Sequence, residues 1–358
     1  MAYRVVHGGT GMTGREGLAG IIKDPDLDLV GVLATTPEKL GKDAGSLCNL
    51  PDTGVIVTGS FDEIVALRPD CFCYCGNVVG REDAAIEDMA RLLEAGINVV
   101  TIATIPMIYA PAARVSWVSR IEAACECGGT SFYATGSEPG LCSMAVPAAM
   151  LGGAGEIDEY RMDLYATTLD VSYPLWEVLH ESMAFGKPDG HVPARISSHK
   201  VEHDWIVVVR YLADILGIAL DSVEVDWDTV VADTDLATAM PDKVIEAGTI
   251  SGHRWRLSGM VDGKPKIAVQ YFAALTTTSW PDHWGERGNA MTMRVKGRPS
   301  MELLIKFDPN PEDRGKMSPL VFTAMAVVNA IPHVVQAASG IITDPIIGRG
   351  AVTRLNRR

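Results

Sequence analysis

The first strand pattern of this chain runs directly into a glycine-rich loop and then into a helix pattern. The apolar run at 3–7 is followed by Gly-Gly-Thr-Gly-Met-Thr-Gly, which contains the spacing GxGxxG at Gly9, Gly11 and Gly14. The spacing alone is weak in a chain with 35 glycines. Between a strand and a helix, however, the first glycine permits a tight turn, the second lets a pyrophosphate approach the backbone, and the third lets helix and strand pack closely. We therefore expect a Rossmann domain that binds a nicotinamide dinucleotide.

The phosphates of such a cofactor lie on free N–H groups at the helix N-terminus. The residues expected to contact them are those of the loop itself, namely Gly9, Thr10, Gly11, Met12, Thr13 and Gly14. The adenosine end depends on the residues after the second strand, where sites that prefer NAD usually have an acid for the ribose 2′-hydroxyl. This chain has Thr35, Thr36 and Lys39 there, which suit a 2′-phosphate and favour NADP. Glu38 or Asp43 could still reach the ribose, so NAD stays possible.

Strand and helix patterns alternate over the first 145 residues, which is typical of right-handed crossover units on a parallel sheet. The expected strands are 3–7, 29–34, 55–58, 70–75, 98–102 and 130–134, and the clearest helices are 15–23, 82–95 and 112–127. Because ligands lie at the carboxyl ends of parallel strands, Gly76, Asn77, Ala103 and Thr104 are expected to line the nicotinamide end of the site.

Longer runs with period-two alternation follow, which is typical of antiparallel strands. We expect strands at 160–166, 223–230, 243–251, 255–260, 266–275, 290–296 and 301–307, interrupted by a helix at about 203–216. Asp262-Gly263 is a hairpin turn signal between two of them. The segment 319–338 has a helical pattern that Pro332 should kink or end. We therefore expect a Rossmann domain at 1–145, completed by 318–358, and an α+β domain with an open, mostly antiparallel sheet at 146–317.

Composition limits the partners. The formal net charge of −14 argues against nucleic acid, because a polyanion repels an acidic protein. No stretch approaches the length of a membrane span, and the chain begins without a signal peptide pattern, so a cytoplasmic protein is expected. Cys71, Cys73 and Cys75 alternate along one strand, and burial in a parallel sheet explains them without a metal. No metal is expected.

Four stretches resemble the dihydrodipicolinate-reductase-like oxidoreductases, in particular the branch of 2,4-diaminopentanoate dehydrogenase and the native amine dehydrogenases. They are GGTGMTGREGLAGIIKDPDLDLVGV from Gly8, TTPEKLGKDAGSLC from Thr35, GSEPGL from Gly136 and TAMAVVNAIPHVVQAASGI from Thr323. The resemblance implies a final helix packed onto the Rossmann domain, with Asn329 near the cofactor. It also implies a second domain for substrate binding and dimerisation, a cleft between the domains, and a homodimer.

One departure from the family concerns the chemistry. Amine dehydrogenases carry a glutamate in the loop after the fifth strand, which handles the amine and its protons. Here that loop reads Thr-Ile-Ala-Thr-Ile-Pro-Met-Ile-Tyr from Thr101 and contains no acid. The expected function is therefore hydride transfer from NADPH or NADH to C=O or C=N of a small, fairly apolar molecule. Two alternatives stay open: an amine dehydrogenase with a displaced carboxylate such as Glu138 or Asp163, and a non-catalytic dinucleotide-binding sensor.

Proton transfer requires a side chain within hydrogen-bond reach of the substrate. Alternation places Arg161, Asp163 and Tyr165 on one face of their strand, and the matching strand of the family faces substrate. The candidate catalytic residues are Asp163, Tyr165 and Thr104, and the candidate substrate contacts are Arg161, Tyr109, Glu138, Leu141, Tyr173 and Trp176.

Overall fold

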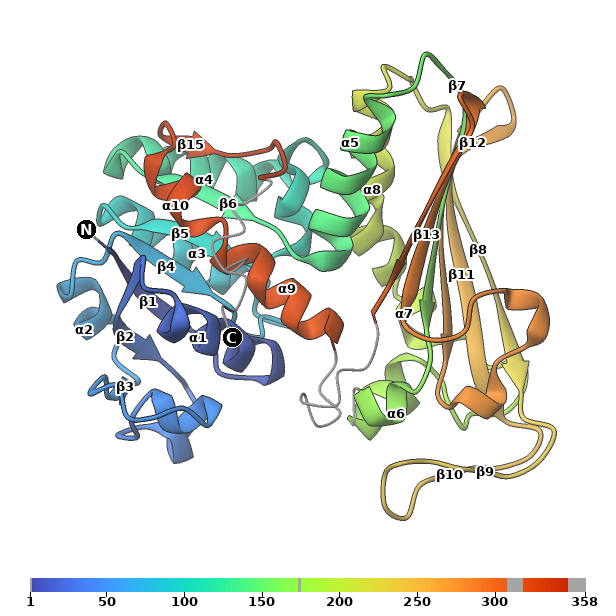
Figure 1. The fold of residues 1–358 in the computed structure, drawn as a ribbon, viewed down its shortest axis with the longest axis horizontal. Coiled ribbons are helices and arrows are strands. Elements are labelled where there is room, and N and C mark those ends of the chain that lie inside the picture. The colour runs from blue at the N-terminus through green and yellow to red at the C-terminus, as the bar shows by residue number, and fades with distance from the viewer. Residues whose placement is uncertain (1, 173–174, 308–317, 347–358) are drawn as a thin grey trace, which may run out of the picture. The chain divides into compact units, whose positions relative to one another are not determined.

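The computed structural model describes residues 2–172, 175–307 and 318–346. The chain divides into two compact units (Figure 1). The first contains the residues up to Ala145 together with those from Leu320 on, and the second contains Val146–Pro319. Among the described residues, no helix combines the length and the apolar character that a membrane span requires.

The first unit is built on a seven-stranded sheet in the order β15-β6-β5-β4-β1-β2-β3, and all of its strand pairs are parallel. The strands are β1 (Tyr3–Gly8), β2 (Leu27–Leu33), β3 (Val57–Thr58), β4 (Cys71–Tyr74), β5 (Asn98–Thr101), β6 (Ser131–Ala134) and β15 (Gly340–Ile341). The connecting helices are α1 (Met12–Lys23), α2 (Phe61–Ala66), α3 (Glu82–Glu94) and α4 (Val115–Gly128). The strand order reverses between β1 and β4, which is where a doubly wound sheet binds its ligand.

The end of the chain returns to this sheet. Helices α9 (Ser318–Val328) and α10 (Ile331–Gln336) are separated by two residues, and Pro332 lies in the first turn of α10. A proline has no N–H to donate and is best tolerated at that position, so the expected break at Pro332 is confirmed. The apolar side chains of both helices join the core beneath β1, β4 and β5. Strand β15 was not predicted, because two residues are too few for a periodic signal.

The second unit is built on a six-stranded sheet in the order β14-β13-β7-β12-β11-β8. The strands are β7 (Glu156–Ala166), β8 (Ser222–Val231), β11 (Ile250–Val261), β12 (Lys264–Ala274), β13 (Ala290–Arg298) and β14 (Met301–Lys306). All pairs are antiparallel except β12 with β7. The hairpin at Asp262-Gly263 is confirmed: both residues have positive φ, and Val261 pairs with Lys264. The expected fold class, a Rossmann domain with a mostly antiparallel second domain, is confirmed.

The two faces of this second sheet differ in chemistry. One face carries large buried side chains such as Tyr160, Met162 and Trp255, and helix α8 (Lys200–Ile215) packs against β11 and β12. The opposite face carries Arg161, Asp163 and their charged neighbours on the other strands. This division follows from the period of two along each strand.

One expected strand was wrong. The segment 243–251 does not form a continuous strand: it contains only β10 (Val244–Ile245), paired with β9 (Leu236–Ala237), and the start of β11. Gly248, at a φ of +79°, interrupts the run after β10. The helix expected at 112–127 begins three residues later than expected: α4 starts at Val115, and the short helical segment η3 (Ile105–Ala112) precedes it.

Candidate functional site

The glycine loop has the geometry that a pyrophosphate requires. A Cβ on Gly9 would lie 2.4 Å from the backbone of Cys75 and Gly76, and Gly9 has a φ of +91°, which side chains rarely adopt. A Cβ on Gly14 would lie 2.1 Å from the carbonyl oxygen of Gly9. A Cβ on Gly11, in contrast, would meet no atom within 4 Å. Gly9 and Gly14 are therefore fixed by packing, whereas Gly11 leaves the approach to the N-terminus of α1 open.

The helix behind the loop can receive anionic groups. Helix α1 begins at Met12, with Gly11 as its N-cap, and no side chain caps its first turn. The first N–H groups of a helix have no partner within it, and they carry the positive end of the helix dipole. These groups and the exposed Gly11 form a cradle that fits a pyrophosphate.

A lysine and an arginine lie at the adenosine end. The Nζ of Lys39 donates hydrogen bonds to the carbonyl oxygen and to Oγ1 of Thr10, at 2.8 and 3.0 Å. Burial lowers the pKa of Lys39, and the positive charge of Arg15 lowers it further. Thr35 and Thr36, which follow β2, are exposed. Lys39 and Arg15 therefore supply positive charge beside the glycine loop, and the hydroxyls of Thr35 and Thr36 are exposed after the neighbouring strand.

The two acids at this end differ. Asp43 accepts hydrogen bonds from the backbone N–H groups of Gly45, Thr53 and Gly54, at 2.7, 2.9 and 2.8 Å. These bonds hold the loop between β2 and β3, and they lower the pKa of Asp43. Glu38 is exposed in the turn η1 (Pro37–Lys39). Asp43 is thus occupied by hydrogen bonds within its own loop, whereas the exposed Glu38 is the acid that a ribose could reach.

The loops after β4, β5 and β6 emerge side by side, because these strands are adjacent and parallel. Gly76 and Asn77 follow β4, and the Asn77 side chain accepts a hydrogen bond from the N–H of Val79. Ala103 and Thr104 follow β5. Thr104 is buried, and its Oγ1 has no hydrogen-bond partner among the described residues. A buried hydroxyl without a protein partner is free to bond to a bound ligand or to water.

Glu138 lies in the loop after β6. The backbone of this loop is fixed by bonds from Thr135 N to Thr101 O, at 2.9 Å, and from Leu141 N to Gly136 O, at 2.8 Å. The carboxyl of Glu138 makes no hydrogen bond to another described residue, and desolvation raises its pKa to about 8. Such a carboxyl can gain or lose a proton near neutral pH. Because β5 and β6 are adjacent and parallel, the loops of Thr104 and Glu138 lie at the same edge of the sheet.

Three further predicted residues lie in this unit. Asn329 follows α9, and its Oδ1 is buried without a partner among the described residues. Tyr109 is buried within η3, and Leu141 lies half-buried in the helical segment η4 (Ser137–Ala145). The predicted cofactor residues of the loops after β1, β4 and β5 thus lie at the carboxyl edge of the sheet, and Asn329 lies in the segment between α9 and α10.

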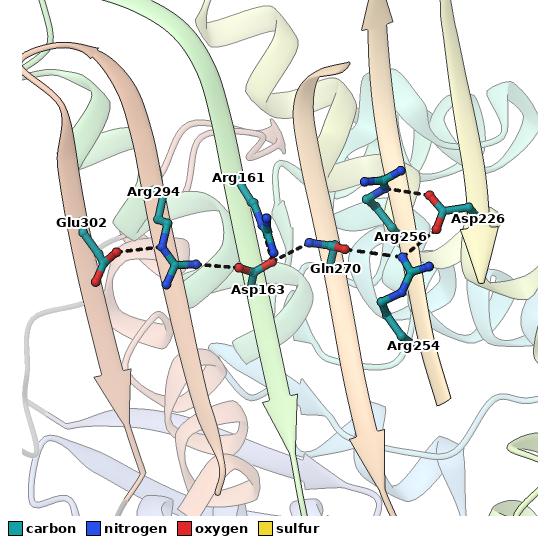
Figure 2. Close-up of polar contacts among 8 residues, drawn as sticks. All are labelled: Arg161, Asp163, Asp226, Arg254, Arg256, Gln270, Arg294 and Glu302. Atoms are coloured by element: carbon teal, nitrogen blue, oxygen red, sulfur yellow. Dashed lines mark hydrogen bonds and ion pairs between the residues drawn. The ribbon is translucent and has the colours of Figure 1, made fainter. Parts of the chain in front are cut away.

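Arg161 and Asp163 lie in the second unit, where they belong to a chain of polar contacts across all six strands (Figure 2). The Asp163 side chain is fully buried. It accepts hydrogen bonds from Arg161 Nε at 2.8 Å, Gln270 Nε2 at 2.8 Å and Arg294 Nη1 at 2.7 Å. Arg294 also binds Glu302, and Gln270 accepts a bond from Arg254. We call these residues, with Asp226 and Arg256, the charged ladder.

The ladder gives Asp163 an environment that differs from that of a proton donor. Its three partners are two guanidinium groups and an amide NH₂, which donate hydrogen and cannot take a proton. Its carboxylate forms ion pairs with Arg161 and Arg294 and offsets their positive charges. A catalytic role for Asp163 stays a prediction, and its contacts favour a structural role.

Tyr165 lies beside the ladder within an aromatic cluster. Its ring stacks on Phe272 at 5.3 Å between centroids and contacts the edge of Trp280 at 6.1 Å. Burial raises the pKa of Tyr165, and the negative charge of Asp163 adds to this effect. The phenol therefore remains protonated at neutral pH, as a donor must.

The remaining predicted substrate contacts lie elsewhere in the second unit. Trp176 stacks on His180 at 5.2 Å, and the Nζ of Lys243 lies over the Trp176 ring. Tyr173 lies outside the described residues. Sequence reasoning missed His253, which stacks on Phe185 and is fully enclosed on the apolar face of the sheet. Neither of its ring nitrogens has a hydrogen-bond partner among the described residues, and burial lowers its pKa to about 3.

Three comparisons with known proteins agree with this architecture. Residues 195–347 match the family model of the 2,4-diaminopentanoate dehydrogenase C-terminal domain. The chain is 28% identical over 361 residues to an amine dehydrogenase of Streptomyces virginiae, covering 98% of each chain.

The fold is shared with solved structures. An amine dehydrogenase from Mycobacterium smegmatis matches with a TM-score of 0.74 at 20% identity, over 96% of this chain and 95% of that one. A scyllo-inositol dehydrogenase from Lactobacillus casei matches with a TM-score of 0.53 at 14% identity, over 96% and 91% of the two chains. The resemblance expected from the sequence is thus confirmed: the chain is similar to an amine dehydrogenase over almost its whole length, and its residues 195–347 match the C-terminal domain of the 2,4-diaminopentanoate dehydrogenase family.

Proposed function

We propose that this chain is an NAD(P)-dependent amine dehydrogenase that interconverts a small, fairly apolar amine with the corresponding ketone or aldehyde and ammonia, and that Glu138 handles the protons. The observation that carries the proposal is a carboxyl that titrates near neutral pH at the carboxyl edge of the Rossmann sheet. The similarity to amine dehydrogenases over the whole chain supports the same reaction class.

The glycine loop supports the cofactor. Gly11 leaves the N-terminus of α1 open to a pyrophosphate, while Gly9 and Gly14 are packed against the backbone. Lys39, together with Arg15, favours the 2′-phosphate of NADP over the free ribose hydroxyl of NAD. Asn329 and Thr104 offer buried polar atoms without partners among the described residues, which suits ligand contacts.

The position of Glu138 follows from the order of the strands. A dinucleotide bound in the usual way would span the point between β1 and β4, with its adenosine toward β2. The loop of Glu138 follows β6, on the opposite side of that point, where the nicotinamide would be held. The acid expected in the loop after β5 is missing, and Glu138 lies in the loop of the adjacent strand.

When bound, the nicotinamide supplies the hydride for reduction of C=N or takes it up from the amine. Glu138 performs the proton transfers around that step. In its neutral form it gives a proton to the hydroxyl that leaves as water when ammonia has added to the carbonyl. In its charged form it takes a proton from an ammonium group. A pKa of about 8 makes both forms accessible near neutral pH.

A substrate panel separates this proposal from its rivals. Purified protein is mixed with NADPH or NADH and a series of small apolar ketones and aldehydes, with and without ammonia, and cofactor oxidation is followed. Turnover that requires ammonia supports an amine dehydrogenase. Equal turnover without ammonia identifies a carbonyl reductase instead. Tight cofactor binding without turnover on any carbonyl, imine, alcohol or amine identifies a dinucleotide sensor.

Replacement of Glu138 tests the assignment of its role. Glu138→Gln keeps the size of the side chain and removes its titration, so kcat should fall by about 10²- to 10⁴-fold with little change in cofactor Kd. Glu126→Gln, at an exposed position on α4, is the matched control and should keep full activity. Unchanged kcat in Glu138→Gln would assign the proton transfers to another group, with Tyr165 the next candidate.

A further inference from the structure

The strand pairing of the Rossmann sheet brings three potential metal ligands together. His7 of β1 is paired directly with Cys73 of β4, and Cys75 follows two residues later on the same side. One ring nitrogen of His7 and the two Sγ atoms all lie within 4.8 Å of one another. All three side chains are buried, and Cys73 and Cys75 belong to the apolar core cluster of this unit.

The His7 ring has the hydrogen-bond pattern of a metal ligand. Its Nε2 lies 2.7 Å from the carbonyl oxygen of Gly9, so Nε2 carries the hydrogen and donates it. The lone pair is then on Nδ1, which is buried and has no partner among the described residues. A metal-bound histidine typically donates its other ring N–H to a carbonyl or carboxylate in this way. A fully buried ring nitrogen left without a partner is otherwise costly.

The two thiols are separated by the distance expected for two ligands of one metal ion. Their Sγ atoms are 3.8 Å apart. Two thiolates bound to one ion at about 2.3 Å, with a tetrahedral angle between them, are about 3.8 Å apart. Two sulfurs and one imidazole form a soft ligand set, which selects Zn²⁺ or Cu⁺ over the oxygen-seeking Mg²⁺ and Ca²⁺.

We propose that His7, Cys73 and Cys75 form a binding site for one thiophilic d¹⁰ cation beneath the glycine loop. The spacing of the cysteines along β4 does not reveal this site, because the third ligand comes from a strand 66 residues earlier in the chain. The bond from His7 to Gly9 links the site to the loop, so an ion bound there would hold the turn at Gly9 from below.

Cadmium titration tests the proposal directly. Cys48 and Cys127 are first replaced by serine, because they are not fully buried and would bind the ion independently. Cd²⁺ is then added to the reduced, oxygen-free protein, both in its folded form and during refolding from urea, so that slow entry is not mistaken for the absence of a site. We expect one equivalent of Cd²⁺ to bind and to give the ultraviolet thiolate-to-cadmium charge-transfer band.

Variants then identify the ligands. Cys73→Ser and Cys75→Ser should each weaken Cd²⁺ binding by at least 100-fold, and His7→Asn by about 10- to 100-fold. Cys71→Ser is the matched control, because Cys71 is equally buried on the same side of β4 but is not part of the cluster. Circular dichroism and thermal melting verify that each variant is folded.

Two results would overturn the site. One is failure of the refolded protein to bind Cd²⁺. The other is a charge-transfer band that persists in Cys73→Ser and Cys75→Ser, or that disappears equally in Cys71→Ser. The readout requires no catalytic activity, so it is independent of the proposed amine chemistry.

Discussion

Lys39 and Thr10 are joined by a hydrogen bond from Nζ to the backbone oxygen at 2.8 Å, across the 29 residues that separate the turn after β2 from the glycine loop. The same Nζ also reaches Oγ1 of Thr10. An ammonium group has three hydrogens, so one donor remains for a ligand. The contact therefore connects the turn after β2 with the glycine loop and fixes a positive charge between them.

This relationship predicts the cofactor preference. Lys39→Ala should raise the Kd for NADPH by about 10- to 100-fold, because it removes a charge-assisted bond to the 2′-phosphate, while the Kd for NADH should change by less than about fivefold. Fluorescence titration of both cofactors measures the two constants. Lys42→Ala, three residues further along, is the control. An equal loss for both cofactors would mean that Lys39 supports the loop without reading the phosphate.

The glycine loop predicts a contrast between two alanine variants. Gly11→Ala places a methyl group where it meets no protein atom, so the melting temperature should stay within a few degrees while dinucleotide binding falls by more than about tenfold. Gly9→Ala forces a contact of 2.4 Å with the backbone of Cys75, and it should lower stability itself. Calorimetry and cofactor titration distinguish the two effects. Normal NADPH affinity in a folded Gly11→Ala variant would contradict the assigned position of the pyrophosphate.

Much of the fold is visible in the sequence because its signals are local. The turn at Gly9, the break at Pro332 and the hairpin at Asp262-Gly263 each depend on a few adjacent residues whose backbone chemistry dictates the conformation. The interrupted run at 243–251 and the two-residue strand β15 were not predictable in the same way. Their pairing is set by distant segments, which a periodic pattern does not encode.

The site is less visible because it depends on pairing between strands. Alternation correctly places Arg161 and Asp163 on one face, but the sequence does not show that Gln270 and Arg294 also bind the carboxylate. Similarly, the raised pKa of Glu138 comes from desolvation in the folded chain, and no sequence motif reports desolvation of that kind.

Glu138 also predicts how stability depends on pH. Its pKa is about 8 in the folded protein and 4.5 at its ordinary value, so the folded state holds the proton more tightly than the unfolded chain. Between these two values, folding takes up a proton, and raising the pH destabilises the fold. Glu138→Gln has no such titrating group, so its stability should not fall in this way. From pH 5 to pH 8 the free energy of unfolding of the variant should therefore rise relative to that of the parent by a few kcal/mol, at about 1.4 kcal/mol per pKa unit.

Urea unfolding across this pH range, compared with Glu126→Gln, measures the effect. The control variant should follow the parent at every pH, because its carboxyl is exposed in both states. Parallel pH curves for Glu138→Gln and the parent would show that the carboxyl is solvated, and the proposed proton-transfer role would lose its basis.

Asp163 provides the sharpest test of structural against catalytic roles. Its side chain is fully buried, whereas Arg161 and Arg294 are 44% and 42% exposed. In Asp163→Asn the two guanidinium groups lose their shared counter-charge and only partly regain water. We therefore expect a loss of about 2–3 kcal/mol in the free energy of unfolding, below the cost of breaking a pair that is buried on both sides. Asp228→Asn, whose carboxyl is 55% exposed, should cost less than about 1 kcal/mol.

The same two variants separate the roles by rate. If Asp163 only balances the ladder, kcat per folded molecule in Asp163→Asn should stay within about tenfold of the parent, because loss of a proton donor costs about 10²-fold or more. Urea unfolding gives the folded fraction under assay conditions, and turnover is divided by it. A 10³-fold fall in kcat at full folding would return Asp163 to the reaction. The group that transfers the proton would then belong to the second unit, and this would contradict the role proposed for Glu138, which belongs to the first.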